Sequence, residues 1–374
     1  MQLRMAGLEL FQEADRQVTT CNACRYCEGL CAVFPAIEAR RSFTKGDIRY
    51  LANLCHDCRA CYQACMYTPP HEFAMNIPQL MSEVRMESYQ HWSWPSALAR
   101  SFTSRSRSAL LGCFAAAVVV IAALLLIPSD RLFATQLGPG AFYRIVPYLG
   151  MVIPGLTLFF YGIVIWLRGI VRFWNEPDSP LLRRPSGLKP LFRAIQDAAT
   201  LKYLDGGGRG CFYSEQAPSQ LRRIFHTCVV VGFLLDLVST TLAFIYQDLL
   251  HILPPYPYLS APVVFGTVGG VFLVIGAIGL LAFKLKSDRA LGRPIAYSLD
   301  YAFLLTLGLT GLTGLLVLLV RTTSALGTIL ILHLAAVAAL FLTAPYGKFV
   351  HFVYRSFALL RFEIERGAEQ QGGH

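Results

Sequence analysis

From about residue 109 onward, long apolar runs alternate with polar connections. Each of six runs can supply the roughly 20 helical residues that cross a hydrocarbon core. The first run begins more than a hundred residues into the chain and follows a cysteine-rich block, so it predicts a membrane span rather than a signal peptide. We therefore expect six transmembrane helices, at 109–127, 145–171, 225–246, 258–283, 299–320 and 326–350.

The residues before these runs form a separate, more polar block. Three stretches within it predict short helices, namely GLELFQEADRQV, KGDIRYLANL and PQLMSEVRMESY. We therefore expect an all-α protein. Its expected parts are a helical ferredoxin-like domain at 1–95, an interfacial linker at 96–108, a six-span membrane domain of the cytochrome b type at 109–362 with a long loop at 174–224, and a flexible tail at 363–374.

Composition and charge support a membrane protein. An apolar content of 55% is too high for a soluble chain of 374 residues. The formal net charge of +10 would suggest a nucleic-acid partner if the basic residues were spread over one surface. They gather instead between the second and third runs and between the fourth and fifth, whereas the other connections hold only Arg131, Arg144 and Arg321. By the positive-inside rule the basic loops and both termini are cytoplasmic, so we expect no nucleic acid.

Two cysteine motifs carry the candidate chemistry of the first block. CNACRYCEGLC at 21–31 and CHDCRACYQAC at 55–65 share the spacing C-x2-C-x2-C-x3-C. In two-cluster ferredoxins the first three cysteines of such a run hold one cluster and the fourth ligates the other. We therefore assign one [4Fe-4S] cluster to Cys21, Cys24, Cys27 and Cys65, and the other to Cys55, Cys58, Cys61 and Cys31.

A zinc site and a structural thiol cluster are the alternatives for these motifs. Zinc usually takes two ligand pairs separated by a longer loop, and two four-cysteine runs hold twice the thiols that one zinc needs. Cytosolic thiols stay reduced, which disfavours disulfides. The proline that usually follows the fourth cysteine is absent, since Ala32 and Met66 stand there. Three further cysteines share no spacing with the motifs and are expected to be small buried apolar residues, namely Cys113, Cys211 and Cys228.

Four histidines lie in or beside the apolar runs. His226 begins the third run and His351 ends the sixth, so both are expected at the cytoplasmic level, where two imidazoles can ligate a b-type haem. Hydrogen-bonding histidines at the interface are the alternative. His251 and His333 form a weaker second pair, because helical geometry sets them roughly 10 Å apart in depth. One haem is therefore expected and a second remains open.

Other polar residues near these histidines have two interpretations each. Lys348, Arg223 and Arg355 can pair with haem propionates or simply anchor helix ends. Asp236, deep in the third run, can take part in proton uptake for quinone chemistry or hydrogen-bond to a neighbouring helix.

Beyond the doubled cysteine motif, three longer stretches carry a family resemblance: CMYTPPHEFAMNIP, LKYLDGGGRGCFYSE and PYGKFVHFVYR. Together they resemble the tricarballylate utilisation protein B family, also called the citrate utilisation type B proteins. The resemblance implies an electron-transfer protein of the bacterial inner membrane, with two [4Fe-4S] clusters and b haem. Such a protein reoxidises the FAD of a partner tricarballylate dehydrogenase, which forms cis-aconitate, and delivers the electrons to quinone.

Three alternatives remain beside this interpretation. The same module is also found joined to a flavoprotein of cobalamin synthesis that acts on a precorrin. A transporter with a redox-sensing domain would be expected to show repeated halves, which the six runs lack. An enzyme with its own substrate chemistry would need a catalytic set that the first block does not offer.

A partner-facing surface is expected at 174–224 together with the cysteine domain. The run GGGRG at 206–210 follows no predicted strand, so it indicates a turn rather than a phosphate cradle. Deleting 205–216 is expected to leave the cofactors bound but to slow electron transfer from the partner.

Overall fold

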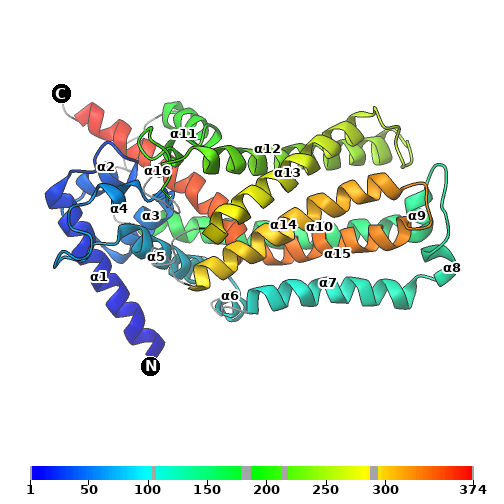
Figure 1. The fold of residues 1–374 in the computed structure, drawn as a ribbon, viewed down its shortest axis with the longest axis horizontal. Coiled ribbons are helices and arrows are strands. Elements are labelled where there is room, and N and C mark those ends of the chain that lie inside the picture. The colour runs from blue at the N-terminus through cyan, green and yellow to red at the C-terminus, as the bar shows by residue number, and fades with distance from the viewer. Residues whose placement is uncertain (1, 103–106, 178–186, 213–217, 287–293, 373–374) are drawn as a thin grey trace.

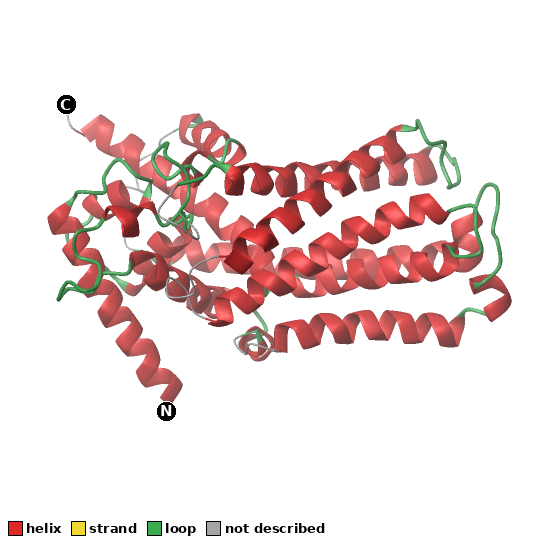
Figure 2. Ribbon diagram, in the orientation of Figure 1, coloured by secondary structure: helices red, strands yellow, loops and turns green. Residues whose placement is uncertain are grey.

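The computed structural model describes residues 2–102, 107–177, 187–212, 218–286 and 294–372. These residues fold almost entirely as helices, as Figure 2 shows, and one isolated antiparallel bridge joins Cys211 to Ser219. Long helices lie side by side in a bundle, and the cysteine domain caps one end of it (Figure 1). The ends of the chain marked N and C both lie at the capped end. The predicted all-α architecture is therefore confirmed.

Six helices of the bundle are long and apolar enough to cross a membrane, as predicted. Pro154 lies inside the second of them without ending it. The third continues into a π-helical turn, Ile245–Leu249. The six are α7 (Arg107–Leu126), α10 (Tyr148–Asn175), α12 (Leu221–Phe244), α13 (Ala261–Lys286), α14 (Pro294–Val320) and α15 (Leu326–Thr343). Short helices α8 (Ser129–Leu132) and α9 (Ala141–Ile145) lie at the far end of the bundle.

Helices α12 and α13 pack closely because glycine removes the side chain at their contact. A Cβ placed on Gly232 would lie 2.7 Å from the backbone nitrogen of Leu273, which no side chain tolerates. Small residues allow membrane helices to approach in this way. The pair brings the start of α12, with His226, against the end of α13.

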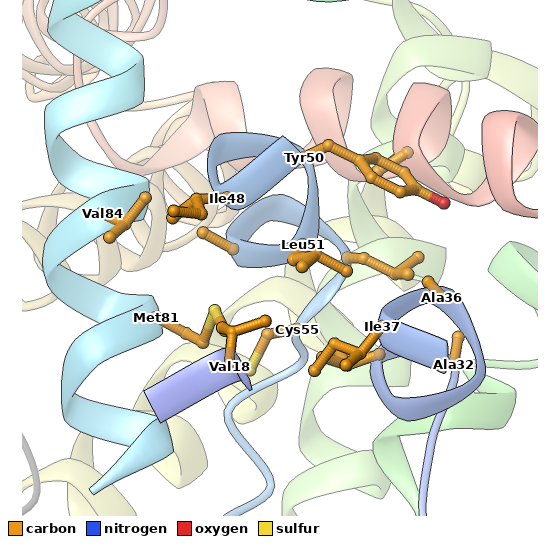
Figure 3. Packing of buried hydrophobic residues seen from close by; sticks show 14 of the residues in the cluster. Val18, Ala32, Ala36, Ile37, Ile48, Tyr50, Leu51, Cys55, Met81 and Val84 are labelled. Atoms are coloured by element: carbon orange, nitrogen blue, oxygen red, sulfur yellow. The ribbon is translucent and has the colours of Figure 1, made fainter. Parts of the chain in front are cut away.

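Five helices build the cysteine domain: α1 (Gln2–Cys24), α2 (Val33–Glu38), α3 (Lys45–Leu54), α4 (Ala60–Ala64) and α5 (Ile77–Trp92). Helix α3 coincides with the predicted KGDIRYLANL segment, and a capping box between Thr44 and Asp47 fixes its first turn. Figure 3 shows Leu51 of α3 between Met81 of α5 and Ile37 of α2. This core holds the second cysteine motif, because α3 ends at Leu54, immediately before Cys55.

The C-terminal segment differs from the prediction. The sixth span ends at Thr343, and a new helix, α16 (His351–Gly372), begins after a tight turn and enters the cysteine domain. Glu365 is 2% exposed and forms ion pairs with Arg40 at 2.7 Å and Arg361 at 3.1 Å. The segment expected to be a flexible tail is thus helical to Gly372 and contributes buried groups, since its ionic side chains find partners in the domain core.

The linker between the two parts also packs against the bundle. Its helix α6 (Ser96–Ser101) leads to Phe102, whose ring stacks on Tyr346 with centroids 5.4 Å apart. The long loop 174–224 contains helix α11 (Lys189–Ala199), which packs against α16. Helices α6, α11 and α16 therefore join the cysteine domain to the end of the bundle.

Candidate functional site

The first predicted ligand set lines one cavity. Cys21 and Cys24 lie in the last turn of α1, and Cys27 follows in the next loop. Together with Cys65 from the second motif they surround a cavity whose other walls include Phe34 and Met75. Cys24 is exposed, whereas the other three are partly buried. The structure thus brings together the four thiols that the crossed assignment groups, although they come from both motifs.

The second set lies deeper in the molecule. Cys55 and Cys58 are buried, and the charges of Cys58, Cys55 and Cys31 reach the thiol of Cys61. Burial, followed by these neighbouring charges, raises the pKa of Cys61 and of Cys31 well above the ordinary range. In the first set burial raises the pKa of Cys21 to about 12. Such thiols become thiolates when a metal supplies the compensating positive charge.

The donor sets suit [4Fe-4S] clusters. Such clusters are held by four cysteine thiolates, which surround a cubane of iron and sulfur rather than a single metal ion. In the described ranges no three His, Cys, Asp or Glu side chains converge at the distance needed to bind a single metal ion. The first set surrounds a cavity instead, which is the arrangement that a cubane requires.

His226 and His351 face one another between α12 and α16. Their ring centroids are 6.1 Å apart and their planes are inclined by 86°. Contrary to the prediction, His351 does not end the sixth span but is the first residue of α16. Its Nδ1 lies 2.6 Å from the carbonyl oxygen of Lys348, which leaves Nε2 as the available ligand atom. The Nδ1 atom of His226 is buried, and among the described residues no group forms a hydrogen bond with it.

The separation of the two rings would allow both imidazoles to ligate one haem iron. Imidazole nitrogens bind first-row metals at about 2.0–2.1 Å, which corresponds to ring centroids about 6–7 Å apart for two ligands of one iron. Burial, followed by the charges of Arg355 and Lys348, lowers the pKa of His351 well below its ordinary value. The neutral imidazole is the form that ligates a metal.

His251 and His333 are not brought together. His333 of α15 lies against α14, where its Nδ1 is 3.1 Å from the hydroxyl of Thr313 and its ring packs on Gly314. His251 is exposed in the loop after the π-helical turn and has a positive φ of 55°. Among the ring contacts of the described residues none joins these two histidines. Ligation of a second haem by this pair therefore has no support from their arrangement.

Two arginines join the histidine pair to the second cysteine motif. Arg222 lies one helical turn before His226 and donates to the carbonyl oxygen of Asp57 at 2.6 Å. Arg355 lies one turn after His351 and donates to the carbonyl oxygen of Cys55 at 2.7 Å. Helix α12, which carries His226, and helix α16, which carries His351, therefore each bind the backbone of the second cysteine motif directly.

The other proposed propionate partners are engaged by protein groups. Arg223 donates to the carbonyl oxygen of Thr200 at 2.6 Å, and Lys348 forms an ion pair with Asp300 at 2.8 Å. Sequence reasoning missed Asp300, which also pairs with Lys284 at 2.6 Å. The available signal was a carboxylate at the start of the fifth span with a lysine at the end of the fourth. Asp236 packs against Gly269, whose missing side chain leaves room for the carboxylate.

The glycine-rich part of the long loop covers the second motif. The backbone N–H of Phe212 donates to the carbonyl oxygen of Cys58 at 2.9 Å. A Cβ on Gly207 would lie 3.1 Å from the side chain of Leu30, beside Cys31. Cys211 is buried as expected, and its thiol donates to the carbonyl oxygen of Leu204 at 3.2 Å. Residues 213–216 of the segment proposed for deletion lie outside the described residues.

The remaining two cysteines have different surroundings. Cys228 is partly buried in α12, whereas Cys113 is exposed on α7 rather than buried. The outer surface of a membrane span faces lipid, so an apolar thiol is stable there without burial in protein.

Comparison with known proteins agrees with this architecture. The sequence model of the citrate utilization protein B family matches residues 102–372, and that of the family's Fer4-like domain matches residues 14–91. Citrate utilization protein B of Escherichia coli is 43% identical over 365 residues, which cover 96% of this chain and 94% of the relative. No solved structure matches the chain significantly. The chain therefore belongs to the citrate utilization protein B family, with a Fer4-like domain ahead of the six helices that can span a membrane.

Proposed function

We propose that this protein reoxidises the reduced flavin of a partner dehydrogenase and passes the electrons through two [4Fe-4S] clusters and one b haem to quinone. The observation that carries the proposal is the double link between the second motif and the histidine pair. Arg222 and Arg355 each lie one turn from a histidine and bind carbonyl oxygens within the second motif. Electron transfer requires cofactors held close together in a rigid frame, which these hydrogen bonds supply.

The surroundings of the two cysteine sets suggest the order of transfer. Cys24 of the first set is exposed, and Tyr26 beside it is 65% exposed, so this set is accessible to a partner protein. The second set is covered by the glycine-rich loop and lies against the bundle. Electrons would therefore enter at the first set, pass to the second and continue to the histidine pair.

Two arginine side chains beside the second set would raise the reduction potential of its cluster. Hydrogen bonds to the sulfur atoms and nearby positive charge raise the reduction potential of an iron–sulfur cluster, and solvent exposure changes it further. Arg85 also donates to the carbonyl oxygen of Cys55, at 2.5 Å, so the positive charges of Arg85 and Arg355 meet at one peptide group. This arrangement favours the reduced cluster.

The proposal for the partner and its substrate is taken from the sequence resemblance. The name of the Escherichia coli relative refers to citrate utilization, and the sequence resemblance implies an FAD-dependent tricarballylate dehydrogenase as the electron donor. We infer that the basic loops and both termini lie in the cytoplasm, where such a dehydrogenase would meet the cysteine domain. We therefore propose that the chain lies in the bacterial inner membrane, with electrons leaving toward quinone within the bilayer.

The first experiment is a dithionite-reduced minus oxidised visible spectrum of the purified protein, with iron and haem quantified on the same sample. Sharp low-spin b-type bands and about eight non-haem irons are expected. One haem per chain is expected, because only His226 and His351 face one another among the four candidate histidines. Broad bleaching without haem bands would contradict the haem assignment while leaving the clusters in place. Reduction of the bands by purified dehydrogenase and tricarballylate tests the partner.

A further inference from the structure

Helix α11 carries its large apolar side chains on the surface. Leu188, Leu191, Phe192 and Ile195 follow the spacing i, i+3, i+4 and i+7 and form one stripe, here called the α11 stripe. Phe192 is 66% exposed and Ile195 is 56% exposed. The opposite face, which packs toward α16, contains the small or polar residues Pro190, Ala194 and Asp197. A helix surrounded by water would have the reverse orientation, so the stripe requires an apolar environment.

The stripe lies beside the point where a spanning helix begins. Arg223, in the first turn of α12, donates at 2.6 Å to the carbonyl oxygen of Thr200, just after α11 ends. Figure 1 shows α11 next to the end of α12 that faces the cysteine domain. The α11 stripe therefore lies close to the start of a spanning helix, where the membrane surface is expected.

Positive charge lies on the side of α11 that faces α16, away from the stripe. A cavity of about 480 Å³ between α11 and α16 is lined by Arg193, Lys202 and Arg366, with Asp197, Gln196 and Thr200 between them. Asp197 pairs with Lys202 at 3.1 Å and Glu363 pairs with Arg366 at 2.6 Å, so these three basic and two acidic groups retain a net positive charge. An apolar stripe with basic side chains on the polar face is typical of helices that lie at the surface of an anionic membrane.

We propose that α11 is an interfacial helix that inserts Leu188, Leu191, Phe192 and Ile195 into the bilayer leaflet next to the cysteine domain. The occupant of the stripe is lipid, and Arg193 and Lys202 contact its anionic head groups. Because α11 packs on α16, which contributes to the core of the cysteine domain, the insertion also fixes the height of that domain above the membrane. The inference is independent of the electron-transfer proposal, since it uses none of the cofactor ligands.

Photocrosslinking in the full-length holoprotein tests the proposal. The Phe192→p-benzoylphenylalanine variant is reconstituted in nanodiscs of phosphatidylcholine and phosphatidylglycerol, illuminated, and analysed for lipid adducts by mass spectrometry. The same photoreactive residue at Leu126, which is 80% exposed on α7, provides the positive control. At Phe73, which is 45% exposed in the cysteine domain, it provides the matched negative control. Insertion of the apolar face into the acyl boundary should give at least about tenfold more lipid adduct at Phe192 than at Phe73. Ile195 provides a second position on the stripe.

Two results would overturn the inference. One is an adduct yield at Phe192 and Ile195 as low as at Phe73, while Leu126 reacts with lipid. The other is crosslinking of both stripe positions to a protein subunit in native membranes, which would make the stripe a docking surface. Unchanged haem and iron contents in the Phe192 variant show that either result comes from a folded protein.

Discussion

The two cysteine sets share one spacing in the sequence but have opposite surroundings in the structure. The first set lines a cavity at the edge of the domain, and its Cys24 is exposed. The second set lies under the glycine-rich loop, where Phe212 binds the carbonyl oxygen of Cys58. The spacing of the cysteines therefore determines which metal cluster a motif can bind. Burial and neighbouring charge determine the reduction potential of that cluster and its accessibility to a partner protein.

The largest expected effect concerns the crossed ligands. Cys65→Ala is expected to remove the first cluster and Cys31→Ala the second, each with loss of about four of about eight irons. Electron paramagnetic resonance of the reduced proteins measures the outcome. The Cys65→Ala spectrum should match that of Cys21→Ala, and the Cys31→Ala spectrum that of Cys58→Ala. A Cys65→Ala spectrum that matches Cys58→Ala instead would show that each motif holds its own cluster.

The next largest effect is loss of haem without loss of the iron–sulfur clusters. His226→Ala and His351→Ala are each expected to abolish the b-type bands, because one axial ligand is lost, while about eight non-haem irons remain. His251→Ala is the control, since His251 is exposed and remote from the pair, and it should keep the full haem content. Haem quantification by the pyridine method provides the measurement. Full haem content in the His351 variant would refute the assignment.

A smaller effect is expected at the link between the second set and the bundle. Arg355→Gln removes the charged donor to the carbonyl oxygen of Cys55 and should lower the free energy of unfolding by about 1–3 kcal/mol. It should also lower the potential of the second cluster, measured by redox titration, and leave the first unchanged. Arg16→Gln breaks an exposed ion pair with Glu13 and should change stability by less than about 1 kcal/mol. Equal shifts of both cluster potentials in Arg355→Gln would contradict the link.

The smallest effect tests the loop over the second set. Gly207 and Gly208 have φ values of 74° and 93°, so alanine strains the backbone at both. Only at Gly207 would the new Cβ press on Leu30, whereas Gly208 has nothing within 4 Å. Gly207→Ala should therefore cost about 1 kcal/mol more than Gly208→Ala and bleach the second cluster faster in air. Identical bleaching rates would indicate that the loop does not protect the cluster. These contacts also lead us to expect cluster loss when 205–216 is deleted, rather than slower transfer alone.

Local patterns predicted the parts of the fold that local forces determine. Apolar runs identified six spans, because the hydrocarbon thickness sets their length. The segment KGDIRYLANL became α3 at its predicted boundaries, because its cap and its apolar face are both local.

The sixth run exposed the limit of this reasoning. Hydropathy extended it to residue 350, yet the span ends at Thr343 and α16 begins at His351. An apolar segment buried in a protein core has the same composition as one buried in lipid, so only the tertiary structure separates them. The same holds for Arg222 and Arg355, whose partners lie more than a hundred residues away in the sequence.

The placement of α16 has a consequence for biosynthesis. Helix α16 follows all six spans in the sequence, yet it supplies Tyr354, Leu359 and Phe362 to the core that surrounds the cysteine motifs. Chains generally fold from the N-terminus as they are made, but the cysteine domain stays incomplete until α16 has followed all six spans out of the ribosome. The chain therefore couples maturation of the cysteine domain to synthesis of α16, so that a product terminated before α16 would lack part of this core.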